Sequence, residues 1–242
     1  MIHYHNESSL TLVLVRIFLV GAVPGQYNYC GKGNEYCGVG CKQGPCNSPN
    51  DVSVPDIVMK DFFNGILNQA TGDCPGKSFY TRTAFINALS SYKQFGRVGS
   101  ADDSKREIAA FFAHATHETR SFCYIEERNV PATENYCNAE KTASICCRNY
   151  NYAQARSNNG FDGLNSPETI ATDAVVSFKA AMWYWMTSVQ QYVSQGFGAT
   201  IKAINGDVEC NGKEPAKVQS RIDKYTQYCQ QFGVAPGENL SC

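Results

Sequence analysis

The clearest periodic pattern of apolar residues lies between Ser104 and Glu127. Four apolar residues recur there at helical intervals: Ile108, Phe111, Phe112 and Ala115. This spacing predicts a helix that buries one face. Ser104 and Glu107 have the spacing of a capping box, which predicts that the helix begins at Ser104. Glu118 falls at the end of the apolar stripe, where partial desolvation favours a protonated carboxyl.

Four further stretches show helical periodicity, and convincing strand alternation is scarce. They are Pro55–Gln69, Thr83–Phe95, Asp173–Val193 and a last helix that opens at Glu214-Pro215 and ends at Gly233. The aromatic-rich stripe of Asp173–Val193 could form a platform for sugars, but its spacing favours a buried central helix. Together these patterns predict a mainly α-helical domain.

The first part of the chain differs in composition from this domain. The apolar run Leu10–Val23 has the length of a signal-peptide core, yet Arg16 interrupts it and no lysine or arginine precedes it. Residues 1–24 are therefore interpreted as a signal-like or altered N-terminal segment, with a membrane anchor less favoured. Residues 25–46 are dense in cysteine, residues 47–53 form a polar linker, and residues 54–242 form the main domain.

Charge and cysteine content narrow the class of protein. The formal net charge of −1 argues against nucleic acid as a partner. Twelve widely spaced cysteines in 242 residues favour disulfides in an oxidising compartment over zinc sites. The sequence therefore predicts a secreted protein, extracellular or vacuolar, without stable membrane association.

Two separated carboxylates are the candidate chemistry. Glu118 is followed nine positions later by Glu127, with Glu126 beside it. An acid and a base roughly 6.5–9.5 Å apart hydrolyse a glycosidic bond with inversion, although glutamates at a helix end are often only surface charge. A metal site with His114 and His117 is disfavoured, because these histidines are three residues apart rather than four. We expect no metal and no other cofactor, with both histidines acting as hydrogen-bonded supports.

Several motifs resemble those of one enzyme family. They are FFAHATHET, FCYIEE, GFDGLNSPETIATDAVVSFKAAMWYWM, QGFGATIKAINGDVECNG and YTQYCQQFGVAPGENLSC. The sequence from about Val54 to Cys242 resembles glycoside hydrolase family 19, the plant-type endochitinases, and most of all their class IV members. The resemblance implies a lysozyme-like, two-lobed domain that breaks down cell-wall chitin in defence against fungi. It also implies that Glu118 is the proton donor and Glu127 the base that activates water.

The resemblance implies roles for further residues. Glu209 and Arg221 correspond to a charge network behind the acid, and Asn205 to a residue that helps to position the attacking water. Lys179, Asn151 and Tyr152 fall on or beside positions of the substrate groove. The implied disulfides are Cys74–Cys123, Cys137–Cys146 and Cys210–Cys242. The implied substrates are chitin and chitooligosaccharides, and we expect a monomer.

Residues 25–46 resemble the second half of a hevein-type chitin-binding module. Tyr27, Tyr29 and Tyr36 fall on the positions of its sugar-stacking rings, and Cys41 and Cys46 on its last disulfide. The first half of the module is absent, so the partners of the remaining two cysteines stay open. Chitin binding by this partial module and a tyrosine-rich linker are both compatible with the sequence.

The chain also departs from the family. A segment with a YYGRGPIQ-like motif, which normally precedes NYNYG, is missing between Cys146 and Asn149. Arg120 and Ser121 replace a Gly-containing stretch after HET, and Cys147 and Cys229 either pair or stay free. The alternative function is therefore a catalytically weakened or dead chitinase-like protein that still binds chitin.

Overall fold

The computed structural model describes residues 50–97, 99–125, 160, 166 and 168–242. The N-terminal segment and the partial module, with Tyr27, Tyr29, Tyr36, Cys41 and Cys46, lie outside these residues. Within the part of the chain that is described, no strand occurs, and no helix is long and apolar enough to cross a membrane. The predicted mainly α-helical fold is confirmed.

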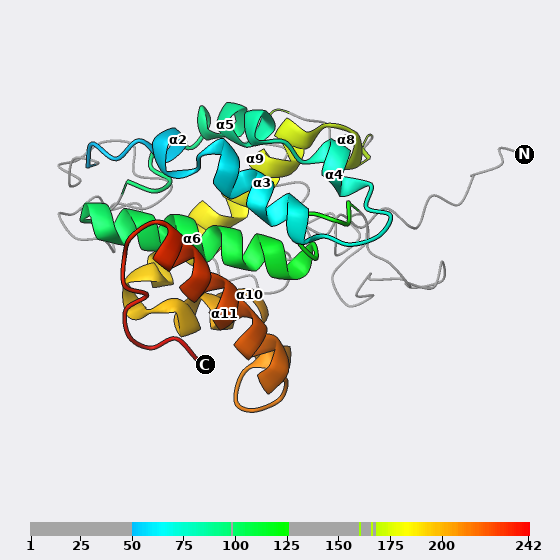
Figure 1. Cartoon of the computed structure of the whole chain (residues 1–242). Helices are drawn as coiled ribbons and strands as arrows, with labels where there is room; N and C mark the ends of the chain where they lie inside the picture. Colours follow the sequence, from blue (N-terminus) through cyan, green and yellow to red (C-terminus); the bar gives the residue numbers. More distant parts are fainter. Residues whose placement is uncertain (1–49, 98, 126–159, 161–165, 167) are drawn as a thin grey trace, which may run out of the picture.

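The described residues form a series of helices, which Figure 1 labels in chain order. They are α2 (Val54–Ile57), α3 (Lys60–Gln69), α4 (Gly76–Phe79), α5 (Arg82–Leu89), α6 (Ala101–Glu118), α8 (Thr169–Thr172), α9 (Ala174–Tyr184), the π-helix η1 (Trp185–Val189), the 3₁₀-helix η2 (Gln190–Gln195), α10 (Phe197–Glu209) and α11 (Pro215–Gln231).

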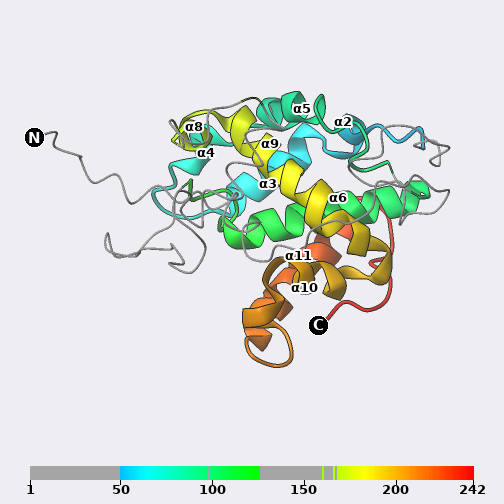
Figure 2. The same ribbon diagram turned by 180° about the vertical axis from the view of Figure 1, so that it is seen from behind.

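Helix α6 divides the domain into two lobes, as Figures 1 and 2 show from opposite sides. Helices α2 to α5, α8 and α9 lie on one side of it, with α5 packed on α9. Helices α10 and α11 and the C-terminus lie on the other, with α11 packed along α6. The functional end of α6 is therefore held between the lobes.

A cluster of aromatic rings fills the core of the first lobe. Its fully buried members include Phe63, Phe85, Phe111, Phe112, Phe122 and Phe178. Most of the neighbouring rings meet edge to face, for example Phe85 and Phe178 with ring centroids 5.6 Å apart. Such pairs add about 0.5–1.5 kcal/mol each beyond the burial of their surface. The predicted apolar stripe of α6 supplies two of these rings, so this face is buried as expected.

The start of α6 differs from the prediction. Ser100, not Ser104, is the N-cap: its Oγ accepts from Asp103 N, and the Asp103 carboxylate accepts from Ser100 N. Ser104 is buried within the helix, and its hydroxyl accepts a hydrogen bond from Asn50. The Ser-x-x-acid pattern occurs twice, four residues apart, and the first copy caps the helix because both of its partners remain at the surface.

Three other predicted helices are shorter or less regular than expected. Pro55–Gln69 breaks at Val58–Met59 between α2 and α3, and Thr83–Phe95 ends as a helix at Leu89. Asp173–Val193 is α-helical only to Tyr184 and then passes through η1 and η2. Its buried stripe is as predicted, but periodicity does not distinguish an α-helix from π and 3₁₀ turns over such short runs.

Buried Glu107 contacts the chain at the two places where the helix type changes. Its Oε1 accepts hydrogen bonds from Trp185 Nε1 at 3.1 Å and Gln190 Nε2 at 2.8 Å, and its Oε2 accepts from Gly96 N at 3.1 Å. The two donors to Oε1 are the first residues of the irregular helices: Trp185 begins η1 and Gln190 begins η2. Burial raises the pKa of Glu107 to about 7, since no cation offsets the loss of water among its hydrogen-bond partners.

Two disulfides join described residues of the domain. Cys74 pairs with Cys123, and Cys210 pairs with Cys242, as the family resemblance implies. The third implied pair, Cys137–Cys146, lies outside the described residues. Cys229 is a free, buried thiol, so the possible Cys147–Cys229 bridge does not form.

Candidate active site

Glu118 is the last residue of α6, and its side chain is 23% exposed. The helix ends there because the chain enters a left-handed turn, with positive φ at Arg120, Ser121 and Phe122. Left-handed residues other than glycine cost about 1–2 kcal/mol each, so the turn needs support from its surroundings. The stretch after HET is therefore strained, because none of these three residues is a glycine.

The support comes from buried contacts. Phe122 is fully buried and stacks on Phe63 with ring centroids 5.4 Å apart. Thr119 Oγ1 accepts a hydrogen bond from Phe122 N at 2.8 Å and donates to Ala115 O. The disulfide to Cys74 then anchors Cys123. These contacts fix the backbone at Cys123, four residues before Glu127 in the sequence.

Arg221, on α11, connects the charged groups of the site. Its Nε and NH2 donate to the two carboxylate oxygens of Glu209, both at 2.7 Å, and NH2 also donates to Glu118 Oε1. Arg221 and Glu209 are buried, whereas Glu118 reaches solvent. Burial opposes the charged form of Glu209, but the hydrogen bonds and charge of Arg221 outweigh it and hold the pKa below its ordinary value.

The two histidines of α6 act as neutral supports. Arg221 NH1 lies 3.1 Å from His114 Nδ1, and because a guanidinium only donates, Nδ1 accepts. The proton of His114 is therefore on Nε2, which donates to Thr200 Oγ1 at 2.9 Å. Burial, together with the charge of Arg221, lowers the pKa of His114 well below its usual value and that of His117 to about 3.

Asn205 joins this network from α10. Its Nδ2 donates to Glu209 Oε1 at 2.6 Å, and its backbone leaves helical geometry with φ −145° and ψ 28°. The resulting kink turns Glu209 and Asn205 toward Arg221. The structure thus brings together four residues predicted for the site, Glu118, Glu209, Arg221 and Asn205, although their catalytic roles stay predictions.

The remaining predicted residues are not joined to this network. Lys179 is half-buried on α9, and among the described residues no hydrogen bond or ion pair connects it to Arg221. Glu127, Asn151 and Tyr152 lie outside the described residues, so the separation of the two proposed catalytic carboxyls is not part of the geometry here. The described stretch that contains α6 runs to Ile125, two positions before Glu127.

Three potential metal ligands lie close together in the network. Atoms of His117, Glu118 and Glu209 are within 4.8 Å of one another. Both carboxylates, however, already accept hydrogen bonds from the guanidinium of Arg221. A cation placed among them would be repelled by that fixed charge, so the donor set fits an arginine-centred network better than a metal centre.

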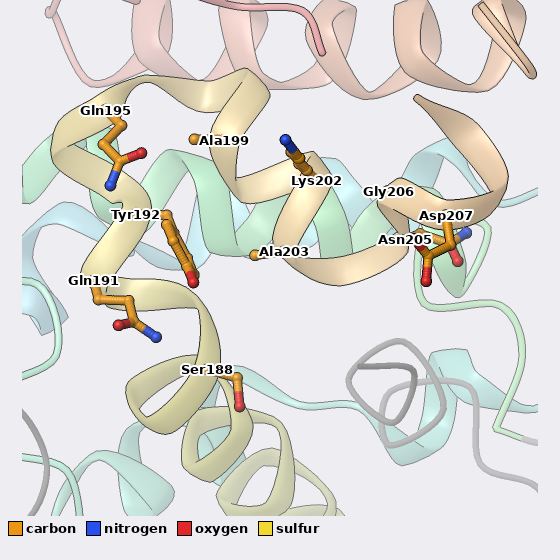
Figure 3. Close-up of a pocket in the computed structure, with 10 residues that line it drawn as sticks. All are labelled: Ser188, Gln191, Tyr192, Gln195, Ala199, Lys202, Ala203, Asn205, Gly206 and Asp207. Carbon is orange, nitrogen blue, oxygen red and sulfur yellow. The ribbon is translucent and has the colours of Figure 1, made fainter. Parts of the chain in front are cut away.

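A groove of about 400 Å³ reaches Asn205 from the side of η2 (Figure 3). Its walls come from η1, η2 and α10, and its lining residues include Ser188, Gln191, Tyr192, Gln195, Lys202 and Asp207. Sequence reasoning did not identify these residues, nor Thr200 and Ser220 of the network. Single small or amide side chains in irregular helices carry no pattern that separates them from ordinary surface residues.

The two-lobed helical domain and its acidic network define a disulfide-stabilised, lysozyme-like glycoside hydrolase. The sequence profile described as Chitinase class I, of the glycoside hydrolase 19 family, matches residues 57–195 and 191–242. The chain therefore belongs to the family 19 chitinases.

Named relatives agree with this assignment. Endochitinase EP3 of Arabidopsis thaliana is 55% identical over 234 residues, covering 90% of this chain and 85% of that protein. Acidic endochitinase SP2 of Beta vulgaris is 48% identical over 250 residues, covering 89% and 86%. The crystal structure of the family GH19, class IV chitinase from Zea mays matches with a TM-score of 0.72 and 47% identity, over 78% of this chain and 98% of that one.

Proposed function

We propose that this protein is an endochitinase that hydrolyses β-1,4 linkages between N-acetylglucosamine units with inversion. Glu118 donates the proton to the leaving oxygen, and Glu127 activates the water. The observation that carries the proposal is the Arg221 network, which fixes a partly exposed carboxyl at the end of α6 beside a fully buried one.

The contacts of the network support Glu118 as the acid. Arg221 holds buried Glu209 with two hydrogen bonds, whereas it meets Glu118 through Oε1, so the second oxygen of Glu118 stays available to a substrate. Glu209 and Arg221 therefore act as positioning residues, while Glu118 is the group that touches the reacting oxygen.

The proposed role of Glu127 as the base is supported by the sequence and by the left-handed turn that follows α6. The disulfide-anchored turn leads the chain from Glu118 toward Glu127, and Asn205 lies at the edge of the groove where a water would be held. Lys179, Asn151 and Tyr152 contact the sugar chain in this proposal. The alignment with the Arabidopsis relative has 234 positions, more than the 90% of this 242-residue chain that it covers, so some positions are gaps in this chain. These gaps fit the deletion of a cleft segment before Asn149. We therefore expect slow activity.

The test is hydrolysis of a chitin hexamer with detection of the product anomer. Glu118→Gln keeps the shape of the side chain but has no proton to donate, so turnover should fall to near background. Glu127→Gln should lose roughly 10²–10⁴-fold, the usual contribution of general base assistance. Glu214→Gln, an exposed glutamate of α11's N-terminus, is the matched control and should behave as wild type. Turnover by Glu118→Gln at the wild-type rate, or retention of the anomer, contradicts the proposal.

The proposal also assigns roles to the N-terminal part of the chain. Residues 1–24 direct secretion to the extracellular space or the vacuole, residues 25–46 bind chitin through Tyr27, Tyr29 and Tyr36, and residues 54–242 carry catalysis as a monomer in plant defence. Comparison of binding to insoluble chitin by the full chain and by a Tyr27→Ala/Tyr29→Ala variant tests the binding module. Equal binding by both proteins excludes a contribution from these two rings.

A further inference from the structure

One buried carboxylate of the core stands apart from the Arg221 network. Glu107 lies on α6 and is 2% exposed. Among the described residues its hydrogen-bond donors are neutral groups: Gly96 N, Trp185 Nε1 and Gln190 Nε2. Burial of a carboxylate is costly unless hydrogen bonds replace the lost water, so these three contacts compensate for it. A carboxylate kept at this cost without a cation calls for a role in the fold or in the site.

The Oε2 side of Glu107 is anchored by a closely packed turn. Oε2 accepts from Gly96 N, and Gly96 has a φ of +66°. A Cβ at this glycine would lie 2.8 Å from Val54 Cγ2 and 2.9 Å from Ile108 Cγ1, so the turn packs against α2 and α6 as closely as a glycine allows. The carboxylate is therefore held in place independently of η1 and η2.

The Oε1 side of Glu107 holds the two irregular helices. Trp185 is fully buried and its indole has a single N–H to donate, so Glu107 is the acceptor that satisfies it. Gln190 is half-buried and donates to the same oxygen at 2.8 Å. Because these donors are the first residues of η1 and η2, one fixed oxygen sets where both helices lie against α6.

The groove that reaches Asn205 has one wall built from these helices. In Figure 3, Gln191, Tyr192 and Gln195 lie on one side of the groove and Asn205 on the other. Gln191 and Tyr192 follow Gln190 directly in the sequence, whereas Gln190 itself is not among the described residues that line the groove. A change at Gln190 therefore reaches the groove through the position of the wall, without removing a lining side chain.

Asn205, across the groove, has a different support. Its Nδ2 donates to Glu209, which the Arg221 network holds. Loss of the contact between Glu107 and Gln190 should therefore displace the η1–η2 wall and leave Asn205 and the network in place.

We propose that Glu107 is a positioning residue for substrate binding, whose carboxylate fixes Gln190 and through it the groove wall that carries Gln191 and Tyr192. The proposal rests on the proposed chitinase function, in which this groove holds part of the sugar chain. An aromatic ring and a few well-placed polar groups are the usual lining of such a groove. Glu107 contributes to affinity for the chain and not to the chemical step.

Gln190→Met is the most selective test, because it leaves the contacts of Glu107 with Trp185 and Gly96 intact. KM for a soluble chitin hexamer should rise roughly tenfold with kcat close to the wild-type value, since a hydrogen bond to a carboxylate is similar in size to a tenfold change in affinity. A purely structural loss would instead lower the active fraction, and with it kcat, at an unchanged KM. Gln227→Met, at an exposed glutamine of α11, is the matched control and should behave as wild type.

Two substitutions of Glu107 add a rescue. Glu107→Leu leaves the N–H groups of Trp185 and Gln190 without this acceptor and should raise KM at least as much as Gln190→Met. Glu107→Gln keeps one oxygen that can accept from both donors, although its new NH₂ group cannot accept from Gly96 N. It should therefore recover most of the loss in KM. A wild-type KM in Glu107→Leu, or the same KM in both variants, contradicts the proposal; if Glu107→Leu does not fold, Gln190→Met decides.

Calorimetry in a Glu118→Gln background separates this proposal from the proposed function. Turnover is abolished there, so the Kd of the hexamer is measured directly, and adding Gln190→Met should weaken binding by the same factor. A wild-type protein that binds the hexamer without cutting it refutes the proposed function alone. An unchanged KM and Kd on Gln190→Met, or an equal change on Gln227→Met, overturns the role of Glu107. A wild-type protein that does not bind the hexamer refutes both.

Discussion

Arg221→Met removes the cation at the centre of the network while keeping a long apolar side chain. In the wild-type protein the guanidinium is fully buried and holds Glu209 through two hydrogen bonds of 2.7 Å. Without it, Asn205 is the hydrogen-bond donor that remains to the buried carboxylate of Glu209 among the described residues. Breaking a buried pair in this way destabilises a protein by about 3–5 kcal/mol, because one charge is left uncompensated.

The assay is guanidinium chloride unfolding at pH 7 with intact disulfides, followed by circular dichroism. For a domain of this size each kcal/mol shifts the melting temperature by about 2–4 °C, so a thermal scan should show a decrease of roughly 6–20 °C. Arg221→Met/Glu209→Gln should recover part of the loss, since the double variant has no stranded charge. Measured together with the loss in Glu209→Gln alone, the two variants complete a double-mutant cycle that gives the coupling energy between the two residues.

An exposed ion pair on the same helix provides the control. Lys217 Nζ lies 3.3 Å from Glu214 Oε1, and both side chains are about half exposed. Lys217→Met should change the free energy of unfolding by no more than about 1 kcal/mol. A loss in Arg221→Met that is no larger than in Lys217→Met would refute the view that Arg221 stabilises a buried charge.

The pH dependence of the stability difference tests the direction of the pKa shift of Glu209. The pKa of Glu209 is below its ordinary value in the folded chain, so its contribution is present above its unfolded pKa and is lost as the pH falls through the folded one. The stability difference between wild type and Arg221→Met should therefore shrink toward acid pH. A difference that grows at acid pH contradicts the assignment of Arg221 as the cause of the shift.

Three further changes test the domain and its cleft. The pKa of Glu107 rises from 4.5 to about 7 on folding, so its contribution to stability should fall by roughly 3 kcal/mol as the pH rises through that window, and the difference in unfolding free energy between wild type and Glu107→Gln should change by that amount between pH 4 and 8. Cys74→Ser/Cys123→Ser opens a loop with a sequence separation of 49 and should cost about 4 kcal/mol in guanidinium unfolding; a loss below about 1 kcal/mol contradicts the entropic estimate. Insertion of a GRGPIQ-containing segment before Arg148 should raise hexamer turnover roughly a hundredfold by restoring the alignment of water, and equal rates would show that the segment is dispensable.

Local patterns in the sequence were sufficient for much of the fold. The apolar stripe of α6 and the proline and glycine that bound α11 report burial and backbone restriction, which act over a few residues. Motif resemblance added the disulfide pairs and the four network residues, because a family motif carries tertiary information that spacing alone lacks. The start of α6 was misplaced because two capping sequences compete, and the tertiary structure decides between them by burying Ser104 and Glu107 while Ser100 and Asp103 stay at the surface.

The amino-acid sequence by itself thus determined the helical class, the buried faces and the candidate acid. Only the tertiary structure decided that Glu118, Glu209 and Arg221 meet, since 103 residues separate Glu118 from Arg221 along the chain. It also decided the kink at Asn205 and the contact of buried Glu107 with Trp185, where the α-helix gives way to a π-helix. Each of these depends on charges and hydrogen-bond partners from distant segments, which no local periodicity encodes.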